Sequence, residues 1–148
     1  MTSKRKIVQD IIRGIHQDIE DYKQLKILIL RQRELMQRRD NSGLERHNSH
    51  QSSVCRQLQA RADKRSQELM SLGFAGDAHG IELLITKLPT QLAKQMETLW
   101  HSLLLLVKES QAVNDDNGNL LVDQQTVISG LLNRHKEVNI DYGMHIPS

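Results

Sequence analysis

Apolar side chains recur every three or four residues along most of this 148-residue chain. This period constrains the fold most, because it matches one face of an α-helix. The clearest run lies between residues 89 and 132, where the apolar positions are Leu92, Met96, Leu99, Leu103, Leu106, Val113, Leu120, Val127 and Leu131. The same stepping puts Ser110, Asn117 and Gln124 at the remaining positions. The phase is unchanged across residues 114–118, so the pattern predicts one continuous helix of about 44 residues.

Two more long helices and one short helix are predicted. Residues 5–39 place Val8, Ile12, Ile15, Ile19, Tyr22, Leu25 and Ile29 on one face. Residues 38–43 contain turn-forming side chains, and a second helix is expected from 52 to 72, with Arg65 where an apolar residue would fit and Gly73 at its C-terminal cap. The short apolar segment 81–88 has no partner strand in the sequence, which favours a packed helix.

Composition agrees with an elongated all-α fold. Only 3% of the residues are aromatic and only two are proline, so the apolar content is mainly of the kind that fills seams between helices. We therefore expect an elongated antiparallel helical bundle or coiled coil of three long helices and one short helix. It would span residues 1–132 and be followed by a polar, flexible C-terminal tail at 133–148.

The charge is unevenly distributed along the chain. Residues 1–66 have a net charge of +7 and residues 67–148 a net charge of −5. A basic half can bind nucleic acid, but it can also consist of helices with solvated faces or lie near the acidic half. Solvated faces are favoured, because the basic half has only Tyr22 for stacking bases and lacks a short turn followed by a recognition helix. A basic helical nucleic-acid-binding regulator remains the alternative function.

The sequence predicts a cytoplasmic protein. The lone cysteine, Cys55, excludes an internal disulfide and fits a reducing compartment. No apolar run approaches the ~18 residues of a membrane span, and polar side chains from Gln9 to Asp18 interrupt any secretory signal.

No constellation of residues predicts an enzyme, a cofactor or a metal site. With Gly118 at the sixth position of a calcium loop, the first and twelfth positions would be Val113 and Gln124, which are not suitable ligands. His47, His50 and Cys55 lack a convincing fourth zinc ligand. Cys55 also falls on the apolar stripe of the second helix, where a small core residue is the simplest interpretation.

The C-terminal third contains a distinctive series of motifs. Leu99-Trp100 comes first, followed by Gln111-Ala-Val-Asn114, then by Asn117-Gly118-Asn-Leu-Leu121, and finally by Tyr142-Gly143. This series resembles the C-terminal signature of FlgN-type flagellar export chaperones. Arg65, Leu69 and Leu72-Gly73 are also similar to the end of that family's middle helix.

This resemblance implies a cytosolic chaperone of type III flagellar export. Its clients would be the hook–filament junction proteins, whose aggregation-prone terminal helices it would keep soluble and deliver to the membrane export gate. By the same resemblance, Tyr142 would contact the export gate. A helical stripe on the chaperone can cover an amphipathic helix of the client, so no catalytic group is needed.

The residues themselves predict where such a client would bind. A doubled apolar stripe in the last part of the third long helix is wider than one neighbour requires, and consists of Leu120, Leu121, Val127, Ile128, Leu131 and Leu132. The alternative is that these residues close the bundle against the first helix.

Asn114, Asn117 and Gly118 form a polar interruption in the same stripe. We expect both asparagines to lie in continuous helix and to satisfy polar groups of a neighbour; the alternative is an exposed loop. A structural coiled coil without a client, and a homo-oligomer, also stay open.

Overall fold

The computed structural model describes residues 3–117 of the chain. This part consists of four α-helices: α1 (Lys4–Gln37), α2 (Asn41–Ser71), α3 (Ala78–Lys87) and α4 (Thr90–Asp116). It contains no strand among the described residues. The predicted fold class, three long helices and one short helix in an elongated all-α arrangement, is confirmed.

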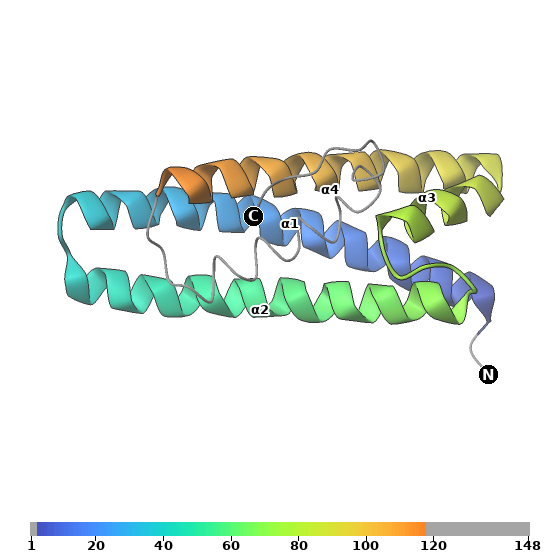
Figure 1. The fold of residues 1–148 in the computed structure, drawn as a ribbon, viewed down its shortest axis with the longest axis horizontal. Coiled ribbons are helices and arrows are strands. Elements are labelled where there is room, and N and C mark those ends of the chain that lie inside the picture. Colours follow the sequence, from blue (N-terminus) through green and yellow to red (C-terminus); the bar gives the residue numbers. More distant parts are fainter. Residues whose placement is uncertain (1–2, 118–148) are drawn as a thin grey trace, which may run out of the picture.

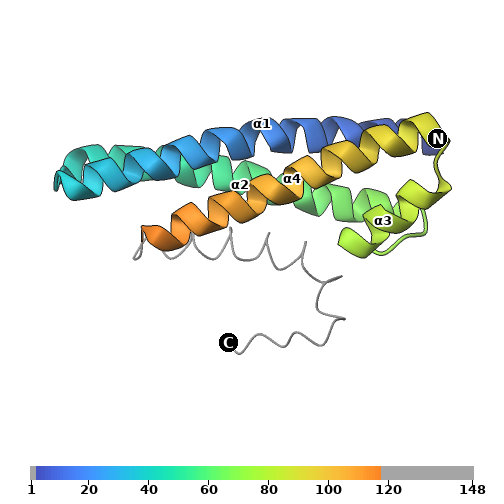
Figure 2. The ribbon, with the colours of Figure 1, turned by 90° about the horizontal axis from the view of Figure 1, so that it is seen from above.

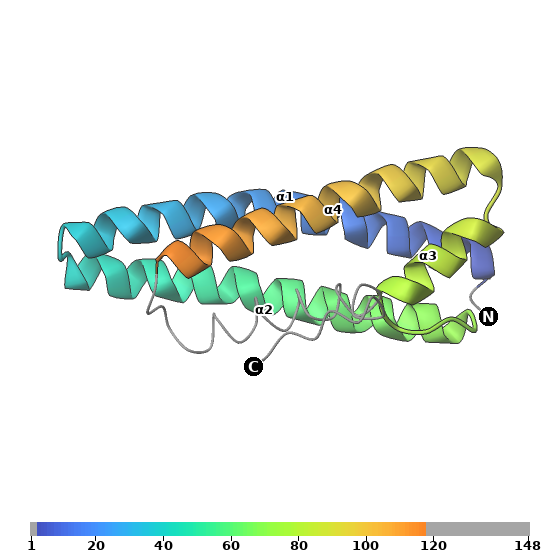
Figure 3. The same cartoon turned by 45° about the horizontal axis from the view of Figure 1, so that its top comes forward.

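The three long helices lie side by side along one axis (Figures 1 and 2). Successive long helices run in opposite directions, so α1 and α4 run parallel to each other. Both α2 and α4 pack against α1, and α3 packs against α4 at the end where α2 finishes. The tip of the α1–α2 hairpin projects beyond the end of α4 (Figure 3).

Local sequence signals explain where the helices begin and end. Ser3, Asp40 and Asp77 cap the starts of α1, α2 and α3, each accepting a hydrogen bond from the backbone N–H three residues later. After α2, Gly73 has φ of 90°, a left-handed conformation that glycine adopts without steric cost. The predicted glycine cap is therefore confirmed.

Two predicted helix boundaries are wrong. The second helix begins at Asn41 rather than near residue 52, because its polar first turns are buried through His47 and Gln51 instead of through apolar side chains. The last long helix ends at Asp116, with Asn117 as its C-terminal cap, so Asn117 does not lie inside a continuous helix. The 115–117 run has low helix propensity, and the Asn117 side chain bonds to the backbone of α1.

The apolar core runs along the bundle from Val8, near the start of α1, to Ile29 in its second half. Its fully buried members include Ile15, Leu25, Leu58, Met96 and Leu103, which come from all three long helices. Towards the hairpin tip the buried positions become polar, and this change places the candidate site.

Candidate functional site

The buried face of α4 changes from apolar to polar along its length. Met96, Trp100, Leu103 and Val107 are buried first, and Ser110, Asn114 and Asn117 occupy the next positions of the same face. The predicted apolar stripe is rotated slightly away from the buried face of α4. Its heptad positions are only partly buried, namely Leu92, Leu99, Leu106 and Val113. The predicted polar positions Ser110 and Asn117 are nevertheless buried against the bundle.

Side chains from α1 and α2 continue this polar layer across the bundle. Gln32 of α1 is buried; its amide nitrogen donates to Asn48, and its oxygen accepts from Gln51 of α2 at 3.3 Å. The Nε2 atom of His47 lies 2.7 Å from the carbonyl oxygen of Leu28 and 3.1 Å from Oε1 of Gln51. Because both neighbours accept hydrogen bonds, Nε2 of His47 bears the hydrogen.

Asn117 joins α4 to α1 at the end of this layer. Its amide nitrogen donates to the carbonyl oxygen of Ile29 at 2.7 Å, and its amide oxygen accepts from Nε of Arg33 at 2.9 Å. The expectation that Asn117 satisfies polar groups of a neighbouring helix is therefore confirmed, although the residue caps α4 rather than lying within it. The exposed-loop alternative is excluded for this residue, which is 6% exposed.

Asn114 is helical and fully buried, as predicted, but its amide differs from that of Asn117. Neither its nitrogen nor its oxygen has a hydrogen-bond partner, and the same holds for the buried hydroxyl of Ser110 within the described part of the chain. The prediction that Asn114 satisfies polar groups is therefore wrong in this conformation. Each such group costs about 1–3 kcal/mol of folding free energy, so this turn of α4 is less stable than an apolar seam would be.

Two ion pairs at the side of the layer fix the register of α4 on α1. Lys26 contacts Glu109 at 3.0 Å and Arg33 contacts Asp116 at 3.7 Å. Both pairs are partly exposed, so each contributes up to about 1 kcal/mol. Together with Asn117, they hold the last turns of α4 against α1.

A separate charged cluster lies in the middle of the bundle. Asp18 of α1 is buried and accepts from Arg61 and Arg65 of α2, both at 2.7 Å, and Arg61 also contacts Asp21 at 2.8 Å. The Arg65 guanidinium also lies 5.7 Å from the Trp100 ring centre, which brings in α4. Asp18 is not singled out from the sequence, although it continues the stepping of Ile11 and Ile15 towards Tyr22, and Arg65 is identified from its place in the apolar stripe and from the family resemblance, without a partner.

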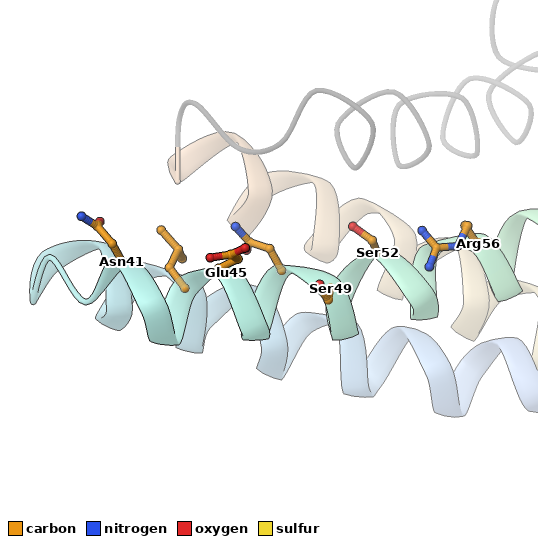
Figure 4. Close-up of a pocket in the computed structure, with 7 residues that line it drawn as sticks. Asn41, Glu45, Ser49, Ser52 and Arg56 are labelled. Carbon is orange, nitrogen blue, oxygen red and sulfur yellow. The ribbon is translucent and has the colours of Figure 1, made fainter.

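A hollow of about 480 Å³ lies along the first half of α2 (Figure 4). Its described lining is mostly polar and comes from one helix: Asn41, Leu44, Glu45, Asn48, Ser49, Ser52 and Arg56. The described residues do not supply the convergent apolar walls of a small-molecule site.

Cys55 does not have the environment of a nucleophile. It is buried on the core face of α2, and this burial raises the pKa of its thiol to about 12. The thiolate required for nucleophilic attack is therefore scarce at neutral pH. Among residues 3–117, no three His, Cys, Asp or Glu side chains lie together as metal ligands would.

The predicted client face and gate contact lie outside the described residues. This applies to Gly118, to Tyr142 and to all six apolar residues, Leu120, Leu121, Val127, Ile128, Leu131 and Leu132. The division at residue 132 and the tail at 133–148 also fall there.

The fold and the site define an all-helical bundle with a polar core layer at one end. A family model described as FlgN protein matches residues 1–143. The chain therefore belongs to the FlgN family, and its general role is that of a flagellar export chaperone. No curated protein and no solved structure gives a significant match. Within residues 3–117, no helix has the length and hydropathy to cross a membrane.

Proposed function

We propose that this chain is a cytoplasmic chaperone that binds the terminal helices of hook–filament junction proteins and delivers them to the flagellar export gate. The observation that supports this best is the FlgN family match over residues 1–143, which includes the polar motif and the segment beyond it. The family match also favours a chaperone over the basic nucleic-acid-binding alternative.

The client surface in this proposal is the doubled apolar stripe of residues 120–132. Its six large apolar residues lie within 13 positions, which as a helix would extend about 20 Å. In the sequence, the stripe directly follows the end of α4, where Arg33 of α1 contacts Asp116 and Asn117. A client helix that covered the stripe would bury its own apolar face in return.

Aspartate substitutions test this surface. Val127→Asp with Leu131→Asp places two carboxylates in an apolar contact, which costs several kcal/mol and should weaken client binding by more than about 100-fold. The matched control is Ile27→Asp with Leu105→Asp, because these two apolar residues are 66% and 60% exposed on the described surface. The measurement is titration of a purified hook–filament junction protein, with helicity followed by circular dichroism.

We expect the first variant to lose client binding while it keeps its helicity, and the control to bind like the unmodified protein. Loss of the helical signal in the first variant would indicate that Val127 and Leu131 belong to the bundle core and not to a client surface. Equal losses in both variants would show that client binding does not depend on this stripe.

Tyr142 is proposed as a contact for the export gate. An aromatic ring with a polar hydroxyl suits a transient hot spot, and by family resemblance its Tyr-Gly pair has this role. Tyr142→Ala should leave client binding within about twofold of the unmodified protein and reduce binding to the gate's cytoplasmic domain. If the same variant lost its client instead, the tail would belong to the client site.

A further inference from the structure

The α1–α2 hairpin between residues 27 and 63, from its projecting tip to the charged cluster in the middle of the bundle, has an unusual set of basic side chains. Between residues 27 and 63 every basic side chain other than histidine is arginine, at positions 31, 33, 38, 39, 46, 56 and 61, whereas the rest of the described chain mixes arginine with lysine. A helix face that only contacts water does not require arginine in preference to lysine. Arginine binds carboxylates through two parallel hydrogen bonds and is enriched at protein interfaces, where lysine is depleted.

Three of these arginines share one flank of the hairpin. On α1, Gln24, Arg31 and Arg38 recur every seven residues and so lie on one side of the helix. Gln24 lies 3.4 Å from His50 of α2, and Arg46 precedes His50 by one helical turn. The Gln24–His50 contact therefore places Arg31, Arg38 and Arg46 on the same outer flank.

These guanidinium groups are available for a partner. Arg31, Arg38 and Arg46 are exposed, and none forms a hydrogen bond or ion pair with a described residue. Glu34 lies between Arg31 and Arg38 along α1 but makes no ion pair with either within residues 3–117. Arg33 differs from them because it is already bound to Asp116 and Asn117.

The backbone conformation of Arg39, at the turn between α1 and α2, is an independent observation that points to a function for this turn. Its φ is 58°, a left-handed conformation that is strained for residues with a Cβ and free for glycine. Gly73 occupies the equivalent position after α2, with φ of 90°. An arginine kept where glycine would be unstrained is a reason to look for function at this turn.

We propose that the flank formed by Arg31, Arg38 and Arg46, with Arg39 at its end, docks an acidic segment of a partner protein. The partner would present carboxylates about 10 Å apart, the spacing of Arg31 and Arg38 along the helix. The large apolar side chains exposed beside this flank are Ile27 and Leu30, on the turn of α1 before Arg31, and no aromatic residue lies between residues 31 and 46 to stack on bases. This surface is distinct from the client stripe and does not rest on it.

A synthetic helical peptide with glutamate at every seventh position is a suitable probe, and the same peptide with glutamine is its reference. Fluorescence anisotropy should show the full-length protein binding the glutamate peptide, with affinity falling as salt screens the charges. Arg31→Gln/Arg38→Gln/Arg46→Gln should weaken binding about tenfold or more. The control Arg5→Gln/Lys94→Gln/Lys108→Gln, which removes the same charge from exposed sites elsewhere, should stay within about twofold.

Arg39→Gly separates docking from stability. It removes one guanidinium and relieves the left-handed strain, so the melting temperature should rise while peptide binding weakens. Three results would overturn the proposal. They are no binding of the glutamate peptide by the unmodified protein, equal losses in the flank variant and its control, or flank-dependent binding only to vesicles containing phosphatidylglycerol, which would identify a membrane contact.

Discussion

Asn114 and Asn117 allow the same substitution to be made twice with opposite expected results. Both are buried, they lie three residues apart on one side of the α4 end, and they differ in their hydrogen bonds. Asn114→Ala removes an amide that has no partner within residues 3–117, and it replaces asparagine by the best helix former. Removing the amide should stabilise the fold by about 1–3 kcal/mol, and the higher helix propensity of alanine should add about 0.5 kcal/mol. The loss of packing offsets part of this, which leaves a net stabilisation of about 1 kcal/mol.

Asn117→Ala should act in the other direction. It deletes the hydrogen bond to the Ile29 carbonyl and the one from Arg33, and leaves a buried carbonyl without that partner. The expected loss is about 2 kcal/mol, so the two variants should differ by about 3 kcal/mol. At about 2–4 °C per kcal/mol for a chain of this size, their melting temperatures should differ by about 6–12 °C.

Thermal unfolding followed by circular dichroism measures this difference directly, and urea titration at one temperature checks it. Equal destabilisation by both substitutions would refute the reasoning, because it would mean that the Asn114 amide has bonds of the same worth as those of Asn117. A stabilised Asn114→Ala variant with weaker client binding would further indicate that the asparagine is retained for function at the expense of stability.

Two further predictions concern the packing of α3 and the core. Gly80→Ala would place a Cβ against the carbonyl oxygen of Ala75, so it should destabilise the fold by about 1–3 kcal/mol in urea unfolding. Gly14→Ala, whose Cβ would meet Arg61 only at 3.8 Å, should instead stabilise α1 by up to about 1 kcal/mol. An unchanged Gly80→Ala variant would show that α3 does not pack as described. Cys55, buried and with a raised pKa of about 12, should react with a thiol reagent only as fast as the protein unfolds, and reaction at the rate of an exposed cysteine would contradict its place in the core.

The fold could be predicted because helical periodicity is written directly in the sequence. Ile15, Leu25, Leu58 and Leu103 of the predicted stripes are all buried, and the turn signals at Asp40 and Gly73 mark real helix ends. The polar parts of the core were harder to predict. His47 and Gln51 precede the predicted start of the second helix at residue 52, because a polar side chain does not reveal in sequence whether its partner is water or another helix.

The same limit applies to the ion pairs and to the candidate site. Asp18 and Arg65 are far apart in sequence, and only the antiparallel pairing of α1 with α2 brings them together. Two opposing factors decide where α4 ends: the unchanged phase of the apolar stripe and the low helix propensity of residues 115–117. Periodicity reports only the first of them. The client stripe beyond it rests on sequence alone.

Site-specific photo-crosslinking tests the proposed client surface most directly. A photoreactive phenylalanine analogue would be placed at Val127 or Leu131 within the proposed client stripe, and at Leu105 on the exposed side of α4 as the control. With a purified hook–filament junction protein present, we predict crosslinks to its terminal helix from Val127 and Leu131 and none from Leu105. Crosslinks from Leu105 with none from Val127 or Leu131 would contradict the proposal that the client binds the chain beyond α4.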